Sequence, residues 1–258
     1  MASILFEVQS GVAHITLNRP DKYNAFNREM ALLLQQHLNH CANHNSIRCV
    51  YITGAGKAFS AGQDLDEVTA PDGPDVTTIL SEHYNPIIVK IRALQKPVVA
   101  AVNGVAAGGG ANIALCCDVV VAAENASFIQ AFSKIGLIPD SGGTYFLPRL
   151  VGWQKASALM LLGDKVSATE AAGMNMIYKV LPNADFSTAA LQLAQTLAQM
   201  PTKGLALTKE ALNYSLTNNL EHQLQTEVRL QLQAGQTHDY NEGVQAFLQK
   251  RAPQFKGK

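Results

Sequence analysis

The sequence has few charged residues and no excess of either sign. Charged residues make up 16% of its 258 residues, with 20 Lys and Arg against 20 Asp and Glu. Nucleic-acid binders carry a basic surface, so a net charge of zero argues against that class of partner. Hydrophobic residues, at 47%, supply ample material for a core and exclude intrinsic disorder. So few charges also favour burial of part of the surface in an oligomer.

Long apolar runs and a leader-like N-terminus are absent as well. No window approaches the roughly 18 unbroken apolar residues of a membrane-spanning helix. Residues 1–7 contain neither a basic region nor an apolar stretch of signal-peptide length. We therefore expect a cytoplasmic protein with no membrane partner.

Cysteine and histidine are too few and too scattered for a metal site. Cys41, Cys49, Cys116 and Cys117 form no C-x-x-C pattern, and an adjacent pair is poorly placed for a disulfide. We expect them to be buried thiols in a reducing compartment. The seven histidines are not clustered at ligand spacing, so the sequence predicts no metal.

Three common catalytic motifs also fail. Lys57 is followed by Ala58 rather than by Ser or Thr, so there is no phosphate-binding P-loop. There is no H-E-x-x-H zinc motif. Residues 58–62, Ala-Phe-Ser-Ala-Gly, approach the nucleophile elbow of serine hydrolases, but alanine replaces its first glycine and no Asp and His partners follow in the hydrolase order. A serine hydrolase is therefore rejected.

The order of apolar patterns predicts an α/β fold with parallel strands. The expected elements are a hairpin at 4–8 and 12–17, a helix at 30–41, a strand at 49–53, a helix at 79–95, a strand at 97–102, a helix from 109 and a strand at 119–122. After residue 150 we expect helices at 153–162, 187–199, 205–215, 220–234 and 242–250, with a single strand at 176–181. We divide the chain into a body, residues 1–195, and a helical C-terminal region, residues 196–258.

Two glycine-rich turns each follow an expected buried strand. One spans residues 60–65, and the other spans residues 103–112 and contains Gly108, Gly109 and Gly110. Three glycines at the start of a helix cost conformational entropy unless the backbone must approach something closely. Tight helix packing would explain either turn alone. Together they suggest two backbone donors that converge on one developing oxyanion.

Asp140 lies in a third distinctive segment, residues 136–144, Gly-Leu-Ile-Pro-Asp-Ser-Gly-Gly-Thr. The Ser-Gly-Gly turn after it predicts the start of a helix. Asp140 is therefore either an N-cap or turn residue of that helix or a functional carboxylate. The spacing alone leaves both interpretations open.

These motifs together resemble those of the enoyl-CoA hydratase/isomerase (crotonase) superfamily, over essentially the whole chain. The residues that carry the resemblance are Asn18-Arg19-Pro20, 58–65, 96–110, Cys117-Asp118 and 142–144. The resemblance implies a crotonase-like spiral of ββα units with a C-terminal helical trimerisation region. It also implies a homotrimer or a hexamer of paired trimers, and an acyl-CoA ligand.

The resemblance assigns roles to individual residues. It implies that the backbone N–H groups of Gln63 and Gly109 form the oxyanion hole for a thioester enolate, beside Asp140 as the catalytic carboxylate. The coenzyme A thioester is expected to contact Ala25, Ala58, Ala61, Asp64, Leu65, Phe132, Phe247 and Lys250. No separate cofactor is implied, because this thioester is the substrate.

Two departures from the hydratase pattern bear on the reaction. Hydratases of this family carry glutamates at the positions of Asn112 and Phe132. Adding water to a double bond needs one group to activate the water and an acid to protonate the α-carbon, and neither Asn nor Phe can serve. Hydration by the usual route is therefore not expected. One base, Asp140, beside an enolate-stabilising hole suits an isomerase, which removes a proton from one carbon and returns it to another.

Residues 128–144 are similar to one branch of the family in particular. That branch isomerises ring-epoxidised phenylacetyl-CoA to an oxepin and also shifts 3,4 double bonds to 2,3; residues 84–86 and 103–108 agree with it. The 4-chlorobenzoyl-CoA dehalogenases also carry this Asp, but Val89 and Phe132 replace their helper His and Trp. We expect Phe132 and Ile138 to surround Asp140 with apolar groups that raise its pKa.

Three alternatives to an isomerase follow from the same resemblance. The first is an enoyl-CoA hydratase-like enzyme of other acyl specificity, and the second is a non-catalytic acyl-CoA-binding relative. An RNA-associated role is the third. It would require a basic stripe, whereas the longest basic feature is the tail at residues 250–258.

Overall fold

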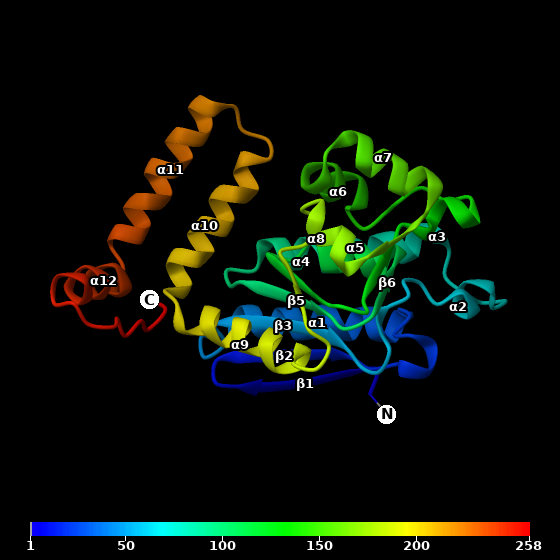
Figure 1. Ribbon diagram of the computed structural model, residues 1–258, viewed down its shortest axis with the longest axis horizontal. Coiled ribbons are helices and arrows are strands. Elements are labelled where there is room, and N and C mark those ends of the chain that lie inside the picture. Colours follow the sequence, from blue (N-terminus) through cyan, green and yellow to red (C-terminus); the bar gives the residue numbers. More distant parts are fainter. Residues whose placement is uncertain (1) are drawn as a thin grey trace.

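The computed structural model describes residues 2–258, and the body of the protein is built on two sheets (Figure 1). The larger sheet has the order β1-β2-β3-β5-β7-β10, with bounds β1 (Ile4–Gln9), β2 (Val12–Leu17), β3 (Cys49–Gly54), β5 (Val98–Val102), β7 (Val119–Ala123) and β10 (Lys179–Leu181). The smaller sheet has the order β4-β6-β8-β9, with bounds β4 (Ala58–Ser60), β6 (Val105–Ala107), β8 (Ser127–Ile129) and β9 (Lys165–Ser167). The pairs β1–β2 and β8–β9 are antiparallel and the others are parallel.

Helices connect the strands and form the whole C-terminal region. Those of the body are η1 (Pro20–Lys22), α1 (Arg28–Asn43), α2 (Leu65–Thr69), α3 (Val76–Thr78), the π-helical turn η2 (Ile79–Tyr84), α4 (Asn85–Ala93), α5 (Gly108–Leu115), η3 (Ala131–Ile135), α6 (Gly143–Val151), α7 (Trp153–Leu162), α8 (Ala168–Gly173) and α9 (Phe186–Gln199). Those that follow are α10 (Thr202–Ser215), α11 (Leu220–Gly235) and α12 (His238–Leu248). None of the described helices combines the length and the apolarity that crossing a membrane requires.

From β3 to β8 the chain visits the two sheets alternately. β3 of the larger sheet is followed by β4 of the smaller one, β5 by β6, and β7 by β8. Helical segments follow each such pair before the chain returns to the larger sheet, as parallel pairing requires. This repeat confirms the spiral of ββα units that the resemblance implied.

The core lies on both faces of the larger sheet. Every residue of β5 is buried, as expected for a central parallel strand covered on both sides. α9 covers one face by packing Ala190, Ala194 and Ala198, spaced four apart, into the core. Residue 195, where the sequence placed the end of the body, therefore falls inside a helix that packs on the sheet.

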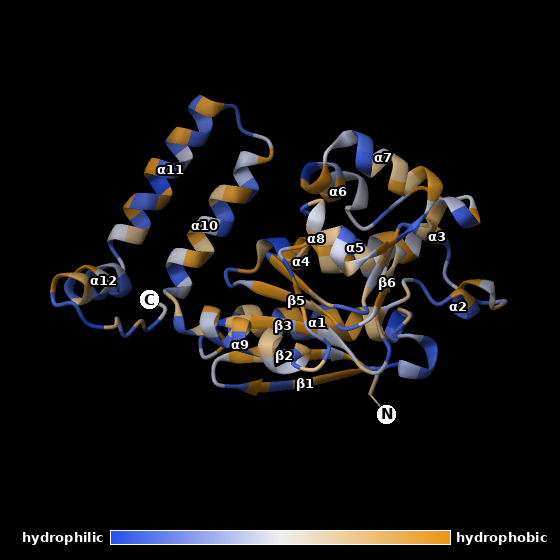
Figure 2. Ribbon diagram, viewed as in Figure 1, coloured by the Kyte–Doolittle hydropathy of each residue, from blue (hydrophilic) through white to orange (hydrophobic). Residues whose placement is uncertain are grey.

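The three helices α10, α11 and α12, here called the helical arm, extend away from the body (Figure 1). α11 packs against α10, yet Leu230 is its only buried residue. Leu220, Leu224, Val228 and Leu232 are 74%, 53%, 63% and 64% exposed, and Figure 2 shows orange patches interspersed with blue along α10 and α11. The arm thus presents an apolar face that no part of residues 2–258 covers.

Most helix and strand predictions are confirmed, with shifts of a few residues at the ends. The first hairpin turns at Ser10 and Gly11, whose φ angles of 50° and 78° suit a two-residue turn. All four cysteines are buried, unpaired thiols, as expected.

The strand predictions missed all four strands of the smaller sheet and made one strand of the larger sheet too long. The strand expected at 176–181 is only Lys179–Leu181, because residues 174–178 form a turn that includes Asn175 at a φ of 62°. Neither β8 (Ser127–Ile129) nor β9 (Lys165–Ser167) was expected. β4 (Ala58–Ser60) and β6 (Val105–Ala107) were not expected either; β4 ends at the first residue of one predicted glycine-rich turn, and β6 lies inside the other.

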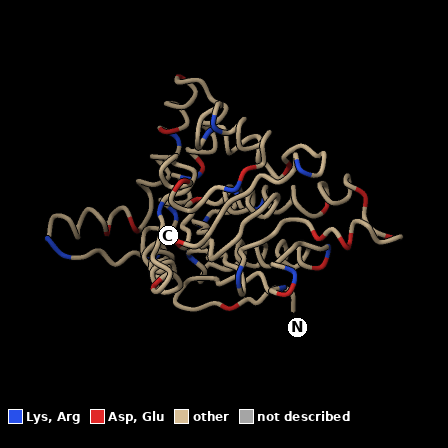
Figure 3. Tube along the Cα trace, turned by 45° about the vertical axis from the view of Figure 1, so that its right-hand side comes forward, with Lys and Arg blue, Asp and Glu red and all other residues tan. Residues whose placement is uncertain are grey.

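Figure 3 shows Lys, Arg, Asp and Glu scattered along the trace. One group of these charged residues is buried between the arm and the body. Lys209 of α10 is buried, and its Nζ donates to the Ile91 and Lys96 carbonyls and to Asp118 Oδ2, at 2.7, 3.3 and 2.7 Å. Arg92 Nη1 donates to the other oxygen of Asp118 at 3.0 Å. Asp118 therefore fastens the arm to the end of the sheet.

We predict that Lys209→Met lowers the free energy of unfolding by about 3 kcal/mol, because it leaves part of a buried ion pair uncompensated. Urea denaturation followed by circular dichroism measures the change. Lys203→Met, at an exposed position of the same helix, is the matched control. An unfolding midpoint for Lys209→Met equal to that of the control would contradict the prediction.

Candidate active site

A cavity of about 250 Å³ opens where α5 begins, between η2 and η3. It is lined by Ala61, Gly62, Gln63, Leu65, Val68, Val76, Ile79, Leu80, Tyr84, Gly108, Gly109, Ala131, Phe132, Lys134, Ile135, Leu137 and Asp140. Most of these side chains are apolar, so a polar group that faces the cavity is poorly solvated. Because the lining includes residues of both glycine-rich turns and Asp140, these three segments meet at one cavity.

Two residues that line this cavity, Gln63 and Gly109, have backbone N–H groups without a strand or helix partner among the described residues. Phe26 N–H donates to the Gly62 carbonyl and Asp64 N–H donates to the Phe26 carbonyl, at 2.7 and 2.8 Å. This pattern turns the N–H of Gln63, between them, away from Phe26. Gly109 lies in the first turn of α5, where N–H groups have no intrahelical acceptor.

The glycine triplet is explained by close approach. Gly108 has a φ of 52°, which disfavours other residues. A Cβ added at Gly109 would lie 2.6 Å from the Tyr84 ring, and one at Gly110 would lie 2.6 Å from Ser60 Cβ. The Gly109 nitrogen is also only 3.5 Å from the Cβ position of Gly62. The contact therefore brings the helix N-terminus against the turn that carries the Gln63 N–H.

Asp140 lies just before α6 but does not cap it. Gly142 is the N-cap residue, and Gly143 N–H donates to the Asp140 main-chain carbonyl at 2.8 Å. Its carboxylate instead accepts a hydrogen bond from Ser141 Oγ at 2.7 Å. The N-cap interpretation left open by the sequence is not what the structure has, and the carboxylate is left to face the cavity.

The surroundings of Asp140 make its charged form less favourable than it is in water. Burial raises the pKa of the Asp140 carboxyl, and the Ser141 hydrogen bond opposes that rise. Phe132 lines the cavity as expected, but Ile138 does not, because its side chain is 81% exposed. The expectation for Ile138 was therefore wrong. Among the described residues that line the cavity, Asp140 is the only carboxylate.

Asn112 does not line the cavity, but its side chain hydrogen-bonds to the main chain of Asp140. The Asn112 side chain is buried, and its Nδ2 donates to the Asp140 carbonyl at 2.8 Å. Gln130 Nε2 in turn donates to Asn112 Oδ1 at 2.8 Å. Gly143 leaves room for this amide, since a Cβ there would lie 2.4 Å from Asn112 Nδ2. The amide thus fixes the main chain that presents Asp140.

The structure brings only some of the expected coenzyme A contacts to the cavity. Ala61, Leu65 and Phe132 line it, together with Gln63, Gly109 and Asp140. Ala25, Ala58 and Asp64 lie outside its lining.

The three residues outside the lining are tied to other groups nearby. The Ala25 carbonyl accepts from Arg19 Nη1, and Asp64 pairs with Arg19 Nη2 at 2.7 Å while it caps α2. The Ala58 carbonyl accepts from Asn24 Nδ2 at 2.7 Å. They hold the first glycine-rich turn in place.

Phe247 and Lys250 lie in and just after the arm and do not line this cavity. Phe247 is 84% exposed and borders a separate apolar hollow of about 440 Å³ beside Phe255.

Several lining residues were not predicted as site residues. Tyr84 is the most notable, because its ring explains why residue 109 must be glycine. The other unpredicted side chains come mainly from short helical segments; they are those of Val68, Val76, Ile79, Leu80, Ala131, Lys134, Ile135 and Leu137. The Tyr-Asn-Pro run at 84–86 is a sequence signal at Tyr84. By itself it indicates only the branch of the family that the chain resembles, not a place in the cavity.

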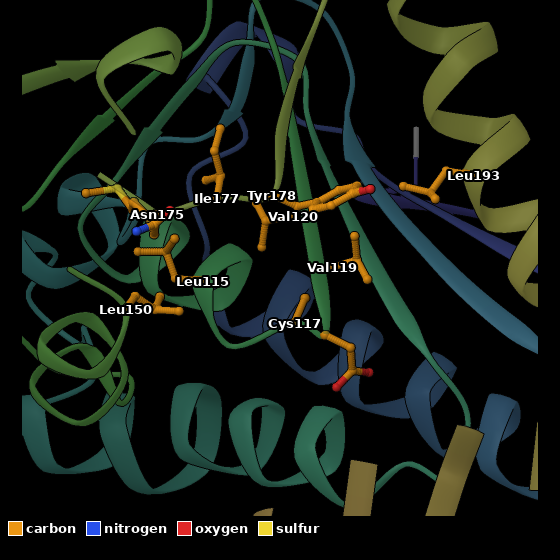
Figure 4. Close-up of a pocket in the computed structure, with 11 residues that line it drawn as sticks. Leu115, Cys117, Val119, Val120, Leu150, Asn175, Ile177, Tyr178 and Leu193 are labelled. Atoms are coloured by element: carbon orange, nitrogen blue, oxygen red, sulfur yellow. The ribbon is translucent and has the colours of Figure 1, made fainter. Parts of the chain in front are cut away.

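A larger hollow of about 520 Å³ lies beside the start of β7, and Figure 4 shows the apolar side chains around it. Its only carboxylate among the described residues is Asp118, which Arg92 and Lys209 already hold. Its described lining therefore offers no free carboxylate. Within residues 2–258, no three His, Cys, Asp or Glu side chains are grouped as a metal would require.

Comparison with known proteins agrees with this geometry. The model of the enoyl-CoA hydratase/isomerase family matches residues 7–258. A 1,2-epoxyphenylacetyl-CoA isomerase from Escherichia coli is 48% identical over 261 residues, covering 100% of both chains. A 2,3-dehydroadipyl-CoA hydratase from the same organism is 37% identical over 258 residues, again covering 100% of both.

Solved structures give the same result for the fold. An enoyl-CoA hydratase from Polaromonas has a TM-score of 0.91 at 35% identity, covering 98% of this chain and 99% of its own. One from Bacillus anthracis has a TM-score of 0.92 at 33% identity, covering 99% and 100%. These findings confirm the resemblance drawn from the motifs: the chain belongs to the enoyl-CoA hydratase/isomerase family.

Proposed function

We propose that this protein is an acyl-CoA isomerase in which Asp140 moves a proton between two carbons of the acyl group. The backbone N–H groups of Gln63 and Gly109 hold the thioester oxygen. The observation that carries the proposal is the lone carboxylate: the described lining of the cavity contains Asp140 and no second acid.

The chemistry follows from this arrangement. A proton on the carbon next to a thioester becomes acidic when the enolate oxygen is stabilised, and two backbone donors supply that stabilisation. Asp140 takes the proton and returns it to a carbon further along, so one group serves as base and then as acid. Burial, which raises the pKa of Asp140, makes it a stronger base for this purpose.

For the substrate, we propose 2-(1,2-epoxy-1,2-dihydrophenyl)acetyl-CoA, isomerised to oxepin-CoA. The same site would shift a 3,4 double bond of an enoyl-CoA to 2,3. Support comes from the 48% identity, over the full length, to a protein named 1,2-epoxyphenylacetyl-CoA isomerase. The mostly apolar lining suits an aromatic or alkyl group rather than a charged one.

A hydratase of other acyl specificity is the second candidate. Its support is the 37% identity to a named hydratase. Against it, Asn112 is buried and its Nδ2 is bonded to the Asp140 carbonyl, so this position offers no acid or base to a water molecule. A non-catalytic acyl-CoA-binding relative is disfavoured by the carboxylate that faces the cavity.

We also propose that the arm assembles three chains, or two such trimers. The exposed apolar residues of α11 need a covering surface, and a second copy of the chain is the simplest source. Phe247 and Lys250 remain proposed coenzyme A contacts. Because they do not line the cavity of their own chain, they would reach that of a neighbouring copy.

We predict that Asp140→Asn lowers kcat for 3-enoyl-CoA isomerisation by at least ~10², while the dissociation constant of a saturated acyl-CoA changes little. Base catalysis typically contributes 10²–10⁴, and asparagine keeps the size and turn of aspartate. Stopped assays by chromatography and calorimetric titration measure the two quantities. Asp164→Asn, at an exposed position away from the cavity, is the control.

The same variant has a pH signature. In the wild-type enzyme, activity should fall as the pH drops through the raised pKa of Asp140, because the protonated carboxyl is no base; the midpoint should lie above the ordinary value of 3.8. Asp140→Asn should lack this acidic limb. A variant with near wild-type turnover would mean that Asp140 is only a turn residue.

We predict negligible hydration of crotonyl-CoA, because Asn112 and Phe132 cannot activate water. Loss of the ultraviolet absorbance of the conjugated thioester measures the reaction. An enoyl-CoA hydratase with known activity on crotonyl-CoA, assayed in parallel, shows that the assay works. Turnover by this protein near roughly 10 per second, a typical enzyme rate, would refute the prediction.

We predict a mass in solution of three or six times 27.7 kDa, and a smaller mass for Leu224→Glu. The new carboxylate would stand on the exposed apolar face of α11, where its desolvation opposes assembly. Light scattering at micromolar concentration gives the masses. Gln225→Glu adds the same charge at an exposed polar position of the same helix. A wild-type monomer would rule out the proposal.

A further inference from the structure

Tyr84 holds a buried hydroxyl that no described residue satisfies. Its side chain is 2% exposed, lines the cavity, and ends the π-helical turn η2. The Tyr84 hydroxyl oxygen has no hydrogen-bond partner among the described residues. Buried polar groups in folded proteins are nearly always paired, so an orphaned one at a cavity wall calls for an explanation. π-helical turns are also found disproportionately at functional sites.

The Tyr84 hydroxyl is a hydrogen-bond donor without an acceptor among the described residues. Burial, the charge of Asp140 and the charge of Glu67 all raise the pKa of Tyr84 well above its usual range. It therefore keeps its proton at neutral pH. Two residues of the lining carry possible acceptors: Gln63, whose Oε1 is also buried and unpaired, and Asp140, one oxygen of which accepts from Ser141 Oγ. Neither is hydrogen-bonded to the Tyr84 hydroxyl, and most of the remaining lining is apolar.

The ring of Tyr84 is held firmly, which fixes where the hydroxyl can act. It lies so close to Gly109 that a Cβ there would be 2.6 Å from Cε1 and 3.1 Å from Cζ. Phe26 lies on another side, with ring centroids 5.7 Å apart. The hydroxyl is thus fixed beside the proposed oxyanion hole and in the same cavity as Asp140.

We infer that the Tyr84 hydroxyl donates a hydrogen bond to an oxygen atom of the acyl group, so that the site selects acyl-CoA thioesters with an ether or epoxide oxygen near the reacting carbons. This inference rests on the proposed isomerase function and deepens it. A hydrocarbon acyl group would bind and leave the hydroxyl unpaired. Sites built to hydrogen-bond a substrate group discriminate strongly against analogues that lack it.

The proton balance of the step is simple, because Tyr84 keeps its proton throughout. One C–H bond next to the thioester breaks and its proton goes to Asp140; one C–H bond forms at a ring carbon and takes that proton back. The electron pair moves along the acyl group into a conjugated double bond. The carbon–carbon bond of the three-membered ring opens, and the oxygen keeps both bonds to carbon in the oxepin. No oxidant or reductant is needed.

Tyr84→Phe tests the inference, since it removes one oxygen atom and keeps the ring against Gly109. We measure kcat and KM for an aryl-epoxide acetyl-CoA and for a 3-enoyl-CoA, whose acyl chain has no oxygen beyond the thioester. The ratio of the two kcat/KM values should shift by at least about tenfold against the epoxide. Tyr51→Phe, at another buried tyrosine outside the cavity, should leave the ratio unchanged.

Two outcomes overturn the inference. An unchanged ratio means that the hydroxyl binds no acyl oxygen. An equal loss on both substrates, with an altered acidic limb of the pH profile, means that Tyr84 acts through Asp140 or the thioester oxygen instead. Failure of the proposed function looks different: the wild-type protein would then isomerise neither thioester, or Asp140→Asn would be fully active.

A binding measurement on the wild-type protein keeps the inference testable if Tyr84→Phe does not fold. Tetrahydropyran-2-ylacetyl-CoA and cyclohexylacetyl-CoA differ only by an ether oxygen in place of a CH₂ group, and neither has a double bond to move. Calorimetric titration should show the ether binding at least about tenfold more tightly. Equal affinities would overturn the inference.

Discussion

The candidate active site depends on how closely backbone segments meet at the start of α5. Gly109 lies against the Tyr84 ring and Gly110 against Ser60, at separations that no Cβ tolerates. The same contact brings the Gly109 nitrogen to the turn that carries Gln63. A backbone N–H group cannot extend toward a ligand as a long side chain can. Two backbone donors can therefore bind the same oxygen only when their two main-chain segments lie next to each other.

Around this contact, most polar groups are engaged in holding the scaffold. Gln130 holds Asn112, Asn112 holds the main chain of Asp140, and Ser141 holds its carboxylate. These buried hydrogen bonds hold the Asp140 segment in one geometry, with Gln130 Oε1 the member of the network that has no partner among the described residues. Among the residues that line the cavity, the Asp140 carboxylate, the Tyr84 hydroxyl and Gln63 Oε1 are not fully engaged. The residues that position the site are thus different from the residues whose polar groups are available to a substrate.

Elements with a strong local pattern could be predicted, and those created by pairing could not. The apolar spacing at residues 30–41 predicted α1 to within two residues at each end, and Ser10-Gly11 predicted the first hairpin. The strands of the smaller sheet are each three residues long, too short to show alternation. They exist because the spiral brings them side by side, which no window of sequence records.

The same difference between local and long-range features holds for the residues of the candidate site. By itself, the sequence determined the alternation of strands and helices, the glycine turns and the carboxylate at Asp140, since each is a local property of a few residues. Only the tertiary structure decided which side chains face the cavity. It placed Ile138 in solvent, Tyr84 against Gly109, and the Asn112 amide on the Asp140 main chain. The reason is that burial and hydrogen-bond partners are set by residues far apart in the chain, which meet only when the sheets and helices pack.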